Sequence, residues 1–206
     1  MSDPPPVDEG AIERLRAEAK SCQACDLWRN ATQTVFGEGG ADSLIVFVGE
    51  QPGDREDLAG RPFIGPAGKI FDQALEEAGV ERKRAYVTNA VKHFKFEPRG
   101  KLRLHKKPNG PEIDACRRWL TAEIDALHPR LIVALGVTAT QSLLGRAVPI
   151  GASRGRIAGV SRGRDVFVTA HPSSLLRAPD EAAKAAAYAL FVADLREAGR
   201  LANLAT

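Results

Sequence analysis

The stretch Leu44-Ile-Val-Phe-Val48, followed directly by Gly49-Glu-Gln-Pro-Gly-Asp-Arg-Glu-Asp-Leu-Ala-Gly-Arg-Pro-Phe-Ile-Gly-Pro-Ala-Gly68, decides the fold of this chain. The apolar, β-branched run predicts a fully buried strand, and the helical apolar spacing of residues 69–78 predicts a helix. The segment between them is far longer than an ordinary strand-to-helix connection. Ligands of open α/β sheets bind beyond the carboxyl ends of the strands. This segment, with five glycines, three prolines and four carboxylates, therefore indicates the wall of a preformed pocket and not a solvated surface loop.

More apolar runs and more helical patterns follow along the chain. The predicted strands after the first cover residues 84–89, 131–135 and 166–170, with 156–158 as a short extra strand. The predicted helices cover residues 9–20, 69–78, 112–127, 138–144 and 181–200. Strands that alternate with helices predict an α/β fold, a three-layer α/β/α sandwich with a mostly parallel four-stranded central sheet. The segment 90–110 is predicted to be a loop.

Composition limits the organisation and the class of the protein. Residues 1–8, with three consecutive prolines, are predicted to be a disordered N-terminus, and residues 9–206 a single domain. The sequence shows neither a long apolar run nor a charged-then-apolar leader, so we expect a soluble cytoplasmic protein without a membrane partner. Nothing in it indicates an obligate dimer, so we expect a monomer. The basic stretch 92–107 beside the acidic stretch 50–57 indicates a polyanionic partner such as nucleic acid.

The three cysteines, Cys22, Cys25 and Cys116, argue against a disulfide framework because their number is odd. The spacing of Cys22 and Cys25 lets two thiolates reach one metal ion or one cluster. A redox pair is an alternative, but such pairs follow a strand, whereas this pair follows a helical pattern. Two ordinary core cysteines are a further alternative, disfavoured by the polar neighbours Gln23 and Asp26.

Polar side chains lie where three predicted strands end: Glu50 and His171 follow their strands, and Asn89 is the last residue of its strand. Carboxyl ends of parallel strands share one edge of a sheet, so we expect these side chains to converge. The amide of Asn89 carries a donor and an acceptor and can pair with the edge of a pyrimidine, on whose face Phe63 could stack. A neutral His171 could donate to an oxygen that gains charge as a glycosidic bond breaks. Glu50 could stabilise a sugar cation or position a water.

Each of these side chains also has a purely structural explanation. Asn89 could cap a turn, Phe63 could belong to the core, and His171 could bond the backbone beside Pro172. Taken singly, the structural and the functional explanations weigh about equally. The shared location of the residues favours the functional one.

Together these motifs resemble the uracil-DNA glycosylases of the iron–sulfur family 4. The similarity extends over nearly the whole chain after Ser21 and rests on Gly49-Glu-Gln-Pro-Gly53, Glu56-Asp57, Gly60-Arg-Pro-Phe-Ile-Gly-Pro-Ala-Gly68, Thr88-Asn89 and His171-Pro-Ser-Ser-Leu-Leu-Arg177. It implies excision of uracil after base flipping, with Phe63 stacked on uracil, Asn89 on its edge and His171 at the oxygen that becomes anionic. We also assign Gln51 to catalysis and substrate binding, Asp54 to substrate binding, and Ser173 and Arg177 to DNA binding.

Three features depart from family 4 and resemble its UdgX subgroup. Gln51 replaces an alanine, His93 replaces a cysteine, and the basic segment 100–108 is an insertion. The subgroup's loop is typically Lys-Arg-Arg-Ile-His, and here it is Lys101-Leu-Arg-Leu-His105, which keeps the histidine and loses one arginine.

The same resemblance implies a covalent step at His105, namely attack on C1′ of the deoxyribose after uracil leaves. A neutral imidazole held near an oxocarbenium-like carbon is a better nucleophile than water. Sequence pattern alone would make His105 a solvated histidine of a basic loop. Its basic neighbours would lower its proton affinity and bind DNA phosphates: Lys101, Arg103, Lys106 and Lys107.

The resemblance further implies a [4Fe–4S] cluster held by Cys22, Cys25, His93 and Cys116. A zinc ion would suit the same four side chains equally well. A structural role is expected, because the cluster would tie the N-terminal segment to the basic loop.

These inferences leave three hypotheses for function. The first is a uracil-DNA glycosylase that excises uracil and then attaches itself to the abasic site through His105. The second is a conventional family 4 enzyme that releases uracil and turns over. The third is a non-catalytic protein that binds uracil or abasic DNA. The partner in every case is uracil-containing DNA, single-stranded or double-stranded.

Overall fold

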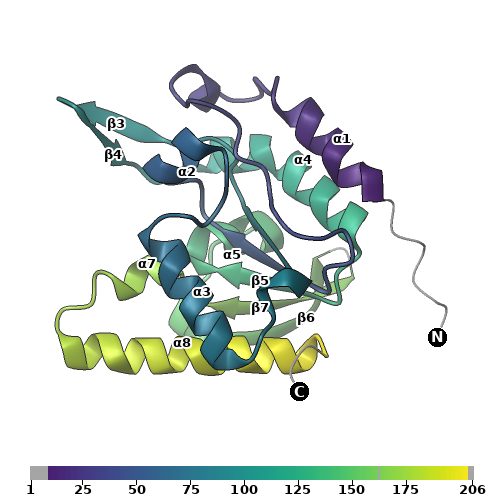
Figure 1. The fold of residues 1–206 in the computed structure, drawn as a ribbon, viewed down its shortest axis with the longest axis vertical. Coiled ribbons are helices and arrows are strands. Elements are labelled where there is room, and N and C mark those ends of the chain that lie inside the picture. Colours follow the sequence, from purple (N-terminus) through teal and green to yellow (C-terminus); the bar gives the residue numbers. More distant parts are fainter. Residues whose placement is uncertain (1–8, 162, 204–206) are drawn as a thin grey trace.

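Strand β1 (Ile45–Gly49) lies inside a five-stranded sheet of order β2-β1-β5-β7-β6. The computed structural model describes residues 9–161 and 163–203 (Figure 1), so the predicted disorder of residues 1–8 lies outside the described part. Strands β2 (Ala85–Asn89), β1, β5 (Leu131–Leu135) and β7 (Arg164–Thr169) are mutually parallel. The predicted parallel four-stranded sheet is confirmed. The short extra strand is also present, as the longer antiparallel edge strand β6 (Gly155–Ser161).

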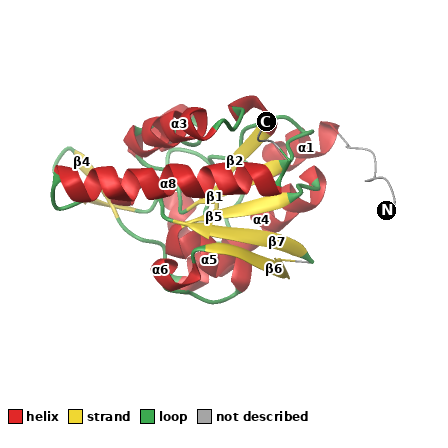
Figure 2. Cartoon of the chain, turned by 90° about the horizontal axis from the view of Figure 1, so that it is seen from below, coloured by secondary structure: helices red, strands yellow, loops and turns green. Residues whose placement is uncertain are grey.

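Helices cover both faces of this sheet, as the predicted three layers require. One face packs against α3 (Pro66–Ala78) and α8 (Glu181–Leu201), with Phe47, Phe71 and Phe191 fully buried between them. The other face packs against α1 (Glu9–Ala19), α4 (Gly110–Leu127) and α5 (Gly136–Leu144). Figure 2 shows α3 and α8 on one side of the strands and α4 and α5 on the other. Both faces are apolar because buried parallel strands must pack on both sides.

Shorter helices connect these layers. They are the 3₁₀ turns Asp26–Arg29 and Arg82–Arg84, and the α-helices α2 (Asp54–Ala59), α6 (Ile150–Ser153) and α7 (Pro172–Leu175). Helix α2 lies inside the long pocket segment. The sequence pattern does not predict this helix, because six residues there look like part of a loop. Among the helices in residues 9–161 and 163–203, none is long and apolar enough to cross a membrane.

The predicted loop 90–110 is wrong in part, because it contains a β-hairpin. Strands β3 (Phe96–Arg99) and β4 (Leu102–His105) pair antiparallel and project from the body of the molecule (Figure 1). Gly100 has a left-handed φ of 60° at the turn, which glycine adopts without the steric cost of a side chain. The two strands are only four residues long, and β3 contains Pro98, which argues against a strand. Strand β4 does alternate, but its apolar side chains Leu102 and Leu104 are exposed and do not pack on a core.

Candidate active site

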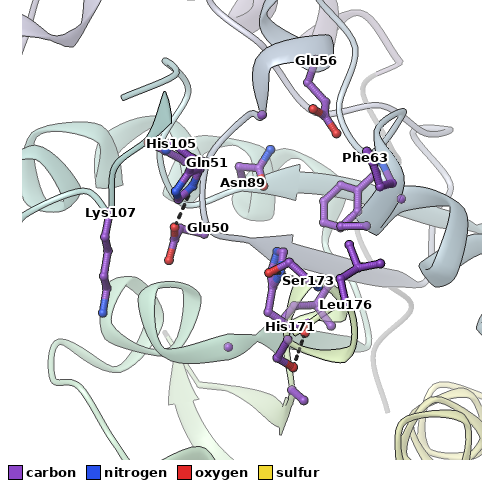
Figure 3. Close-up of a pocket in the computed structure, with 18 of the residues that line it drawn as sticks. Glu50, Gln51, Glu56, Phe63, Asn89, His105, Lys107, His171, Ser173 and Leu176 are labelled. Carbon is purple, nitrogen blue, oxygen red and sulfur yellow. Dashed lines mark hydrogen bonds and ion pairs between the residues drawn. The ribbon is translucent and has the colours of Figure 1, made fainter. Parts of the chain in front are cut away.

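A cavity of about 1020 Å³ opens at the carboxyl ends of the parallel strands. Figure 3 shows side chains from separate elements around it. Most of the residues assigned to catalysis, uracil or DNA line this cavity: Glu50, Gln51, Asp54, Phe63, Asn89, His105, Lys107, His171, Ser173 and Arg177. Lys101, Arg103 and Lys106 are not among its lining residues. The expected convergence at one rim of the sheet is therefore observed.

Asn89 ends strand β2, and its side chain lies above Gly49 at the end of β1. Glycine is required there, because a Cβ on Gly49 would lie 2.4 Å from Asn89 Oδ1 and 2.7 Å from Phe63 Cζ. Asn89 is only 3% exposed. Its amide forms no hydrogen bond with any group in the part of the chain that the structure describes. The amide faces the cavity, so its donor and acceptor are available to a ligand.

Phe63 forms the apolar wall of the cavity and is held in an unusual backbone conformation. Its φ is 58°, in the left-handed region that bulky residues rarely adopt. The ring lies 5.2 Å from the Phe71 ring and 6.4 Å from the His171 ring, centroid to centroid. Gly68 allows the bend, because a Cβ there would lie 1.7 Å from the Phe63 carbonyl oxygen. Strain of this kind persists where the surroundings impose it, and it collects at functional sites.

The carboxylate of Glu50 is held by two hydrogen-bonding partners. Thr138 Oγ1 donates to Glu50 Oε2 at 2.6 Å, and His105 Nε2 lies 3.2 Å from Glu50 Oε1. Burial opposes the charged form, but the hydrogen bonds from His105 and Thr138 outweigh it and lower the pKa of Glu50. Glu50 is therefore an anion at neutral pH. It faces the cavity and orients the imidazole of His105, which the hairpin carries into the rim.

His171 begins the short helix α7 with a defined ring orientation. Its Nδ1 accepts the backbone N–H of Ser173 at 3.1 Å, so Nε2 carries the proton of the neutral ring. Desolvation lowers the pKa of His171 to about 4, against the opposing effect of Glu50. The imidazole is therefore neutral at pH 7 and can donate a hydrogen bond from Nε2.

Gln51 lines the cavity, but its amide is already bonded to the base of the hairpin. Its Nε2 donates to the carbonyls of Lys95 at 3.1 Å and Lys106 at 3.0 Å, and its Oε1 accepts the Lys95 N–H at 3.0 Å. The side chain is 7% exposed. Gln51 thus ties the pocket segment to both hairpin strands.

Arg103, assigned to DNA phosphates, points instead toward helix α2. Its guanidinium forms ion pairs with Asp54 at 2.5 Å and with the fully buried Asp57 at 2.6 Å. It also lies over the rings of Phe94 and Phe96, at 5.4 and 5.1 Å. A guanidinium with two carboxylate partners has little capacity left for phosphate. Asp54 is likewise engaged with Arg103, although it lines the cavity.

The other residues assigned to DNA are exposed, except Ser173, which is partly buried. Lys106 pairs with Glu97 at 2.5 Å on the hairpin surface, whereas Lys107 lines the cavity mouth. Ser173 and Arg177 lie on and beside α7, next to Leu176, which is half-exposed at the same mouth. Basic groups and an exposed apolar side chain therefore surround the opening.

The three cysteines gather between α1, the following turn and α4. Trp119 Nε1 donates to Cys22 Sγ at 3.1 Å, and the Lys92 N–H donates to Cys116 Sγ at 3.2 Å. Burial raises the pKa of Cys25, and raises that of Cys116 to about 12. Within residues 9–161 and 163–203, no three His, Cys, Asp or Glu side chains are close enough to hold one metal ion.

His93 lies near this region, with its ring 3.1 Å from Thr34 Oγ1 through Nε2. Thr34 donates its own proton to the Ala19 carbonyl at 2.9 Å, so Thr34 accepts from Nε2–H and Nδ1 keeps a free lone pair. Burial lowers the pKa of His93. The donor set fits a thiolate-rich cluster, because N–H groups point at two sulfurs and the imidazole is neutral. The lack of three close ligands in the described residues gives no direct support to a single zinc ion or to a cluster.

Two residues of the site were given no role from the sequence. Thr138 follows the third parallel strand, so the argument that selected Glu50, Asn89 and His171 could have found it. Glu56 is 9% exposed and accepts the Gly65 N–H at 2.9 Å, which holds the pocket segment closed over Phe63. The sequence does not reveal this role of Glu56, because it depends on where helix α2 places the side chain.

Comparison with known proteins gives a consistent assignment. Residues 36–196 match the family model described as "Uracil DNA glycosylase superfamily". The type-4 uracil-DNA glycosylase of Thermotoga maritima is 41% identical over 170 residues, which cover 82% of this chain and 85% of that protein. The type-4 enzymes of Sulfurisphaera tokodaii and Archaeoglobus fulgidus are 35% and 34% identical, over 82% of this chain and 78% and 85% of theirs. This chain therefore belongs to the type-4 family of the uracil DNA glycosylase superfamily.

Proposed function

We propose that this protein excises uracil from DNA. One observation carries the proposal: the Asn89 amide is 3% exposed, lines the cavity and has no hydrogen-bonding partner in the described part of the chain. Beside it lies Phe63, whose ring suits stacking on a planar base. An amide offers one donor and one acceptor, which match the carbonyl and the N–H on the uracil edge. Cytosine presents the opposite pattern, so Asn89 would discriminate against it.

The rim residues divide the chemistry between the base and the sugar. The C1′–N1 bond breaks and its electron pair leaves with uracil, whose oxygen gains negative charge. The neutral His171 would donate Nε2–H to that oxygen, which stabilises the leaving anion. The Glu50 carboxylate would stabilise the sugar cation and position an attacking water. DNA is brought to the cavity by the basic groups around it, and the base must leave the helix to enter.

The names of the relatives favour turnover, in which water completes the reaction and free uracil and abasic DNA are released. The direct test mixes the protein with a uracil-containing oligonucleotide, single-stranded and double-stranded. Free uracil and alkali-labile strands are expected in amounts that exceed the protein. An oligonucleotide with cytosine at the same position is the control. No released uracil from either substrate would contradict the proposal and favour a non-catalytic binding protein.

The position of His105 favours a second candidate, the UdgX-type covalent trap. His105 lines the cavity and lies against Glu50. When Nε2–H donates to Glu50, the lone pair is on Nδ1. That lone pair would form a bond to C1′ as uracil departs, and Glu50 would accept the Nε2 proton, which leaves a neutral imidazole on the sugar. The protein would then act once.

A denaturing gel separates the two candidates. Covalent attachment gives a band of summed mass that survives heat and detergent, whereas turnover gives broken strands after alkali and no shifted band. His105→Ser should remove the band and leave released uracil. A band that persists in this variant would exclude His105 as the nucleophile.

We further propose that Cys22, Cys25, Cys116 and His93 hold a [4Fe–4S] cluster. The group of three cysteines, the N–H donors aimed at two of their sulfurs and the free Nδ1 of His93 support it. Its role would be structural, because these residues lie behind the sheet rim and do not line the cavity. Iron and sulfide content of the purified protein test this proposal. We also propose that residues 9–206 form one domain that acts as a monomer.

A further inference from the structure

A fully buried ion pair lies directly behind Asn89. Lys92 Nζ and Glu123 Oε2 are 2.5 Å apart, and both side chains are at most 1% exposed. The Glu123 carboxylate also accepts from the Gly37 N–H at 3.0 Å, Tyr86 Oη at 2.9 Å and Thr88 Oγ1 at 3.0 Å. None of these groups lines the cavity. The pair is therefore outside the chemistry assigned so far.

The ammonium group of Lys92 uses all three of its protons. It donates to Glu123, to Thr88 Oγ1 at 2.6 Å and to the backbone carbonyl of Asn89 at 2.8 Å. Strand β2 is an edge strand of the sheet. On its outer side Glu38 forms a bridge with Val87, two residues before Asn89, so this bridge does not bind the Asn89 carbonyl. The lysine supplies the missing donor where the chain turns toward the cavity.

Stability alone does not explain this arrangement. Burying two charges costs desolvation energy, and apolar residues of similar volume often stabilise a core as well or better. What the pair provides is a fixed direction, because a charged donor with three acceptors allows one position for the Asn89 carbonyl. The Asn89 side chain must meet the uracil edge within the tolerance of a hydrogen bond. A displaced backbone would lose that alignment.

We propose that Lys92 and Glu123 are positioning residues that hold Asn89 in register with the uracil edge. This inference rests on the proposed uracil excision. Lys92 also donates its backbone N–H to Cys116, so the same residue joins the cysteine region to the base pocket. A substitution of the Lys92 side chain leaves the backbone contact with Cys116 in place. An experiment can therefore remove the contact with Asn89 alone.

The test is a double-mutant cycle between the pair and Asn89. Lys92→Met with Glu123→Gln removes both charges together and preserves volume, so no charge is left unpaired. We expect kcat/KM for uracil excision to fall by roughly tenfold, and the inhibition constant of free uracil to rise with it. In an Asn89→Ala background the same double change should alter kcat/KM less than about twofold, because the residue through which it acts is gone.

Two controls make the cycle decisive. Tyr86→Phe removes one donor to Glu123 but leaves the Lys92 contact with Asn89, so the inhibition constant of uracil should stay at the wild-type value. Iron content equal to wild type confirms that the cysteine region is intact. Should the double variant fail to fold, Thr88→Val enters the same cycle, because it removes a hydroxyl that Lys92 also contacts.

If the double change lowered kcat/KM by the same factor in the wild-type and Asn89→Ala backgrounds, the positioning role would be overturned. An unchanged uracil inhibition constant in the double variant would do so as well. A wild-type protein that releases no uracil contradicts the proposed function itself. The two failures are therefore distinguishable.

Discussion

The rim of the parallel sheet and the β3–β4 hairpin both supply side chains to one cavity, but they hold them differently. On the rim, Asn89 ends one fully buried strand and Glu50 follows another, and helices pack on both faces of these strands. The hairpin has no such support, since most of its residues are exposed. Its position depends on side chains, chiefly Gln51 at its base and Arg103 on its inner face.

This difference separates rigid from adjustable parts of the site. The rim would bind the base, where a small displacement breaks a hydrogen bond. The hairpin carries His105, which must meet a sugar that arrives with the DNA. Fewer buried contacts permit local opening at lower free energy. We therefore expect changes on the rim to act on the reaction itself, and changes on the hairpin to act on His105 and on DNA binding.

The largest effect should come from Asn89→Ala. It removes the amide that pairs with uracil, and two lost hydrogen bonds correspond to roughly 2–4 kcal/mol, or a loss of about 30- to 1000-fold in kcat/KM. Single-turnover release of uracil measures the loss. Asn109→Ala is the matched control: it removes the N-cap of α4, where Asn109 Oδ1 accepts the Glu112 N–H at 3.0 Å. The control should lose about 1 kcal/mol of stability and little activity. Equal activity of the two variants would refute base recognition by Asn89.

Next in size is the effect of Arg103→Met on the hairpin. It leaves the buried Asp57 carboxylate without its cation, although the backbone N–H of Thr32 still donates to it at 3.0 Å. We expect a loss of roughly 2–3 kcal/mol in the free energy of unfolding, with faster amide exchange in residues 96–105. Arg99→Met, on the exposed part of the same hairpin, is the control and should change both quantities little. If both variants behaved alike, the ion pairs with α2 would not hold the hairpin.

The sheet rim and the hairpin also differ in how well the sequence predicts them. The strands of the sheet are visible in the sequence because buried parallel strands are continuous apolar runs. Their order also places Glu50, Asn89 and His171 at one rim. The hairpin is not predicted because its strands are short and Pro98 interrupts the first, so the alternation of Leu102 and Leu104 alone does not separate a strand from a loop. The ion pairs of Arg103 are not visible in the sequence for a related reason, since its partners lie 46 and 49 residues away.

The interior polar network was invisible for a different reason. Lys92 and Glu123 are 31 residues apart, and each looks like a solvated charge in a sequence. Only the packing of α4 against β2 brings them together. Thr138, by contrast, could have been found, because it follows a parallel strand at the same rim. The sequence pattern predicts the helices and strands, whereas pairs of charged residues distant in sequence are known only from the folded structure.

A smaller effect concerns pH, through His171 on the rim. Its pKa is lowered to about 4 in the folded protein, against about 6.5 when unfolded. Between these values the unfolded chain binds more protons, so stability falls as pH falls from 6.5 toward 4. One proton gives a slope of at most about 1.4 kcal/mol per pH unit. Urea unfolding at several pH values measures it, and His171→Gln should flatten the curve in this window. An unchanged curve would mean that the histidine is solvated.

The smallest effect belongs to the hairpin tip. Lys101 is exposed and makes no hydrogen bond or ion pair with residues 9–161 and 163–203. If it binds a phosphate, Lys101→Ala should weaken DNA binding severalfold and reduce the slope of log K against log salt by about one. Lys106→Ala should reduce the slope less, because Glu97 already neutralises that charge. Fluorescence anisotropy at several salt concentrations measures both. An unchanged slope for Lys101→Ala would place the tip off the DNA and leave His105 as the hairpin's one contribution to the reaction.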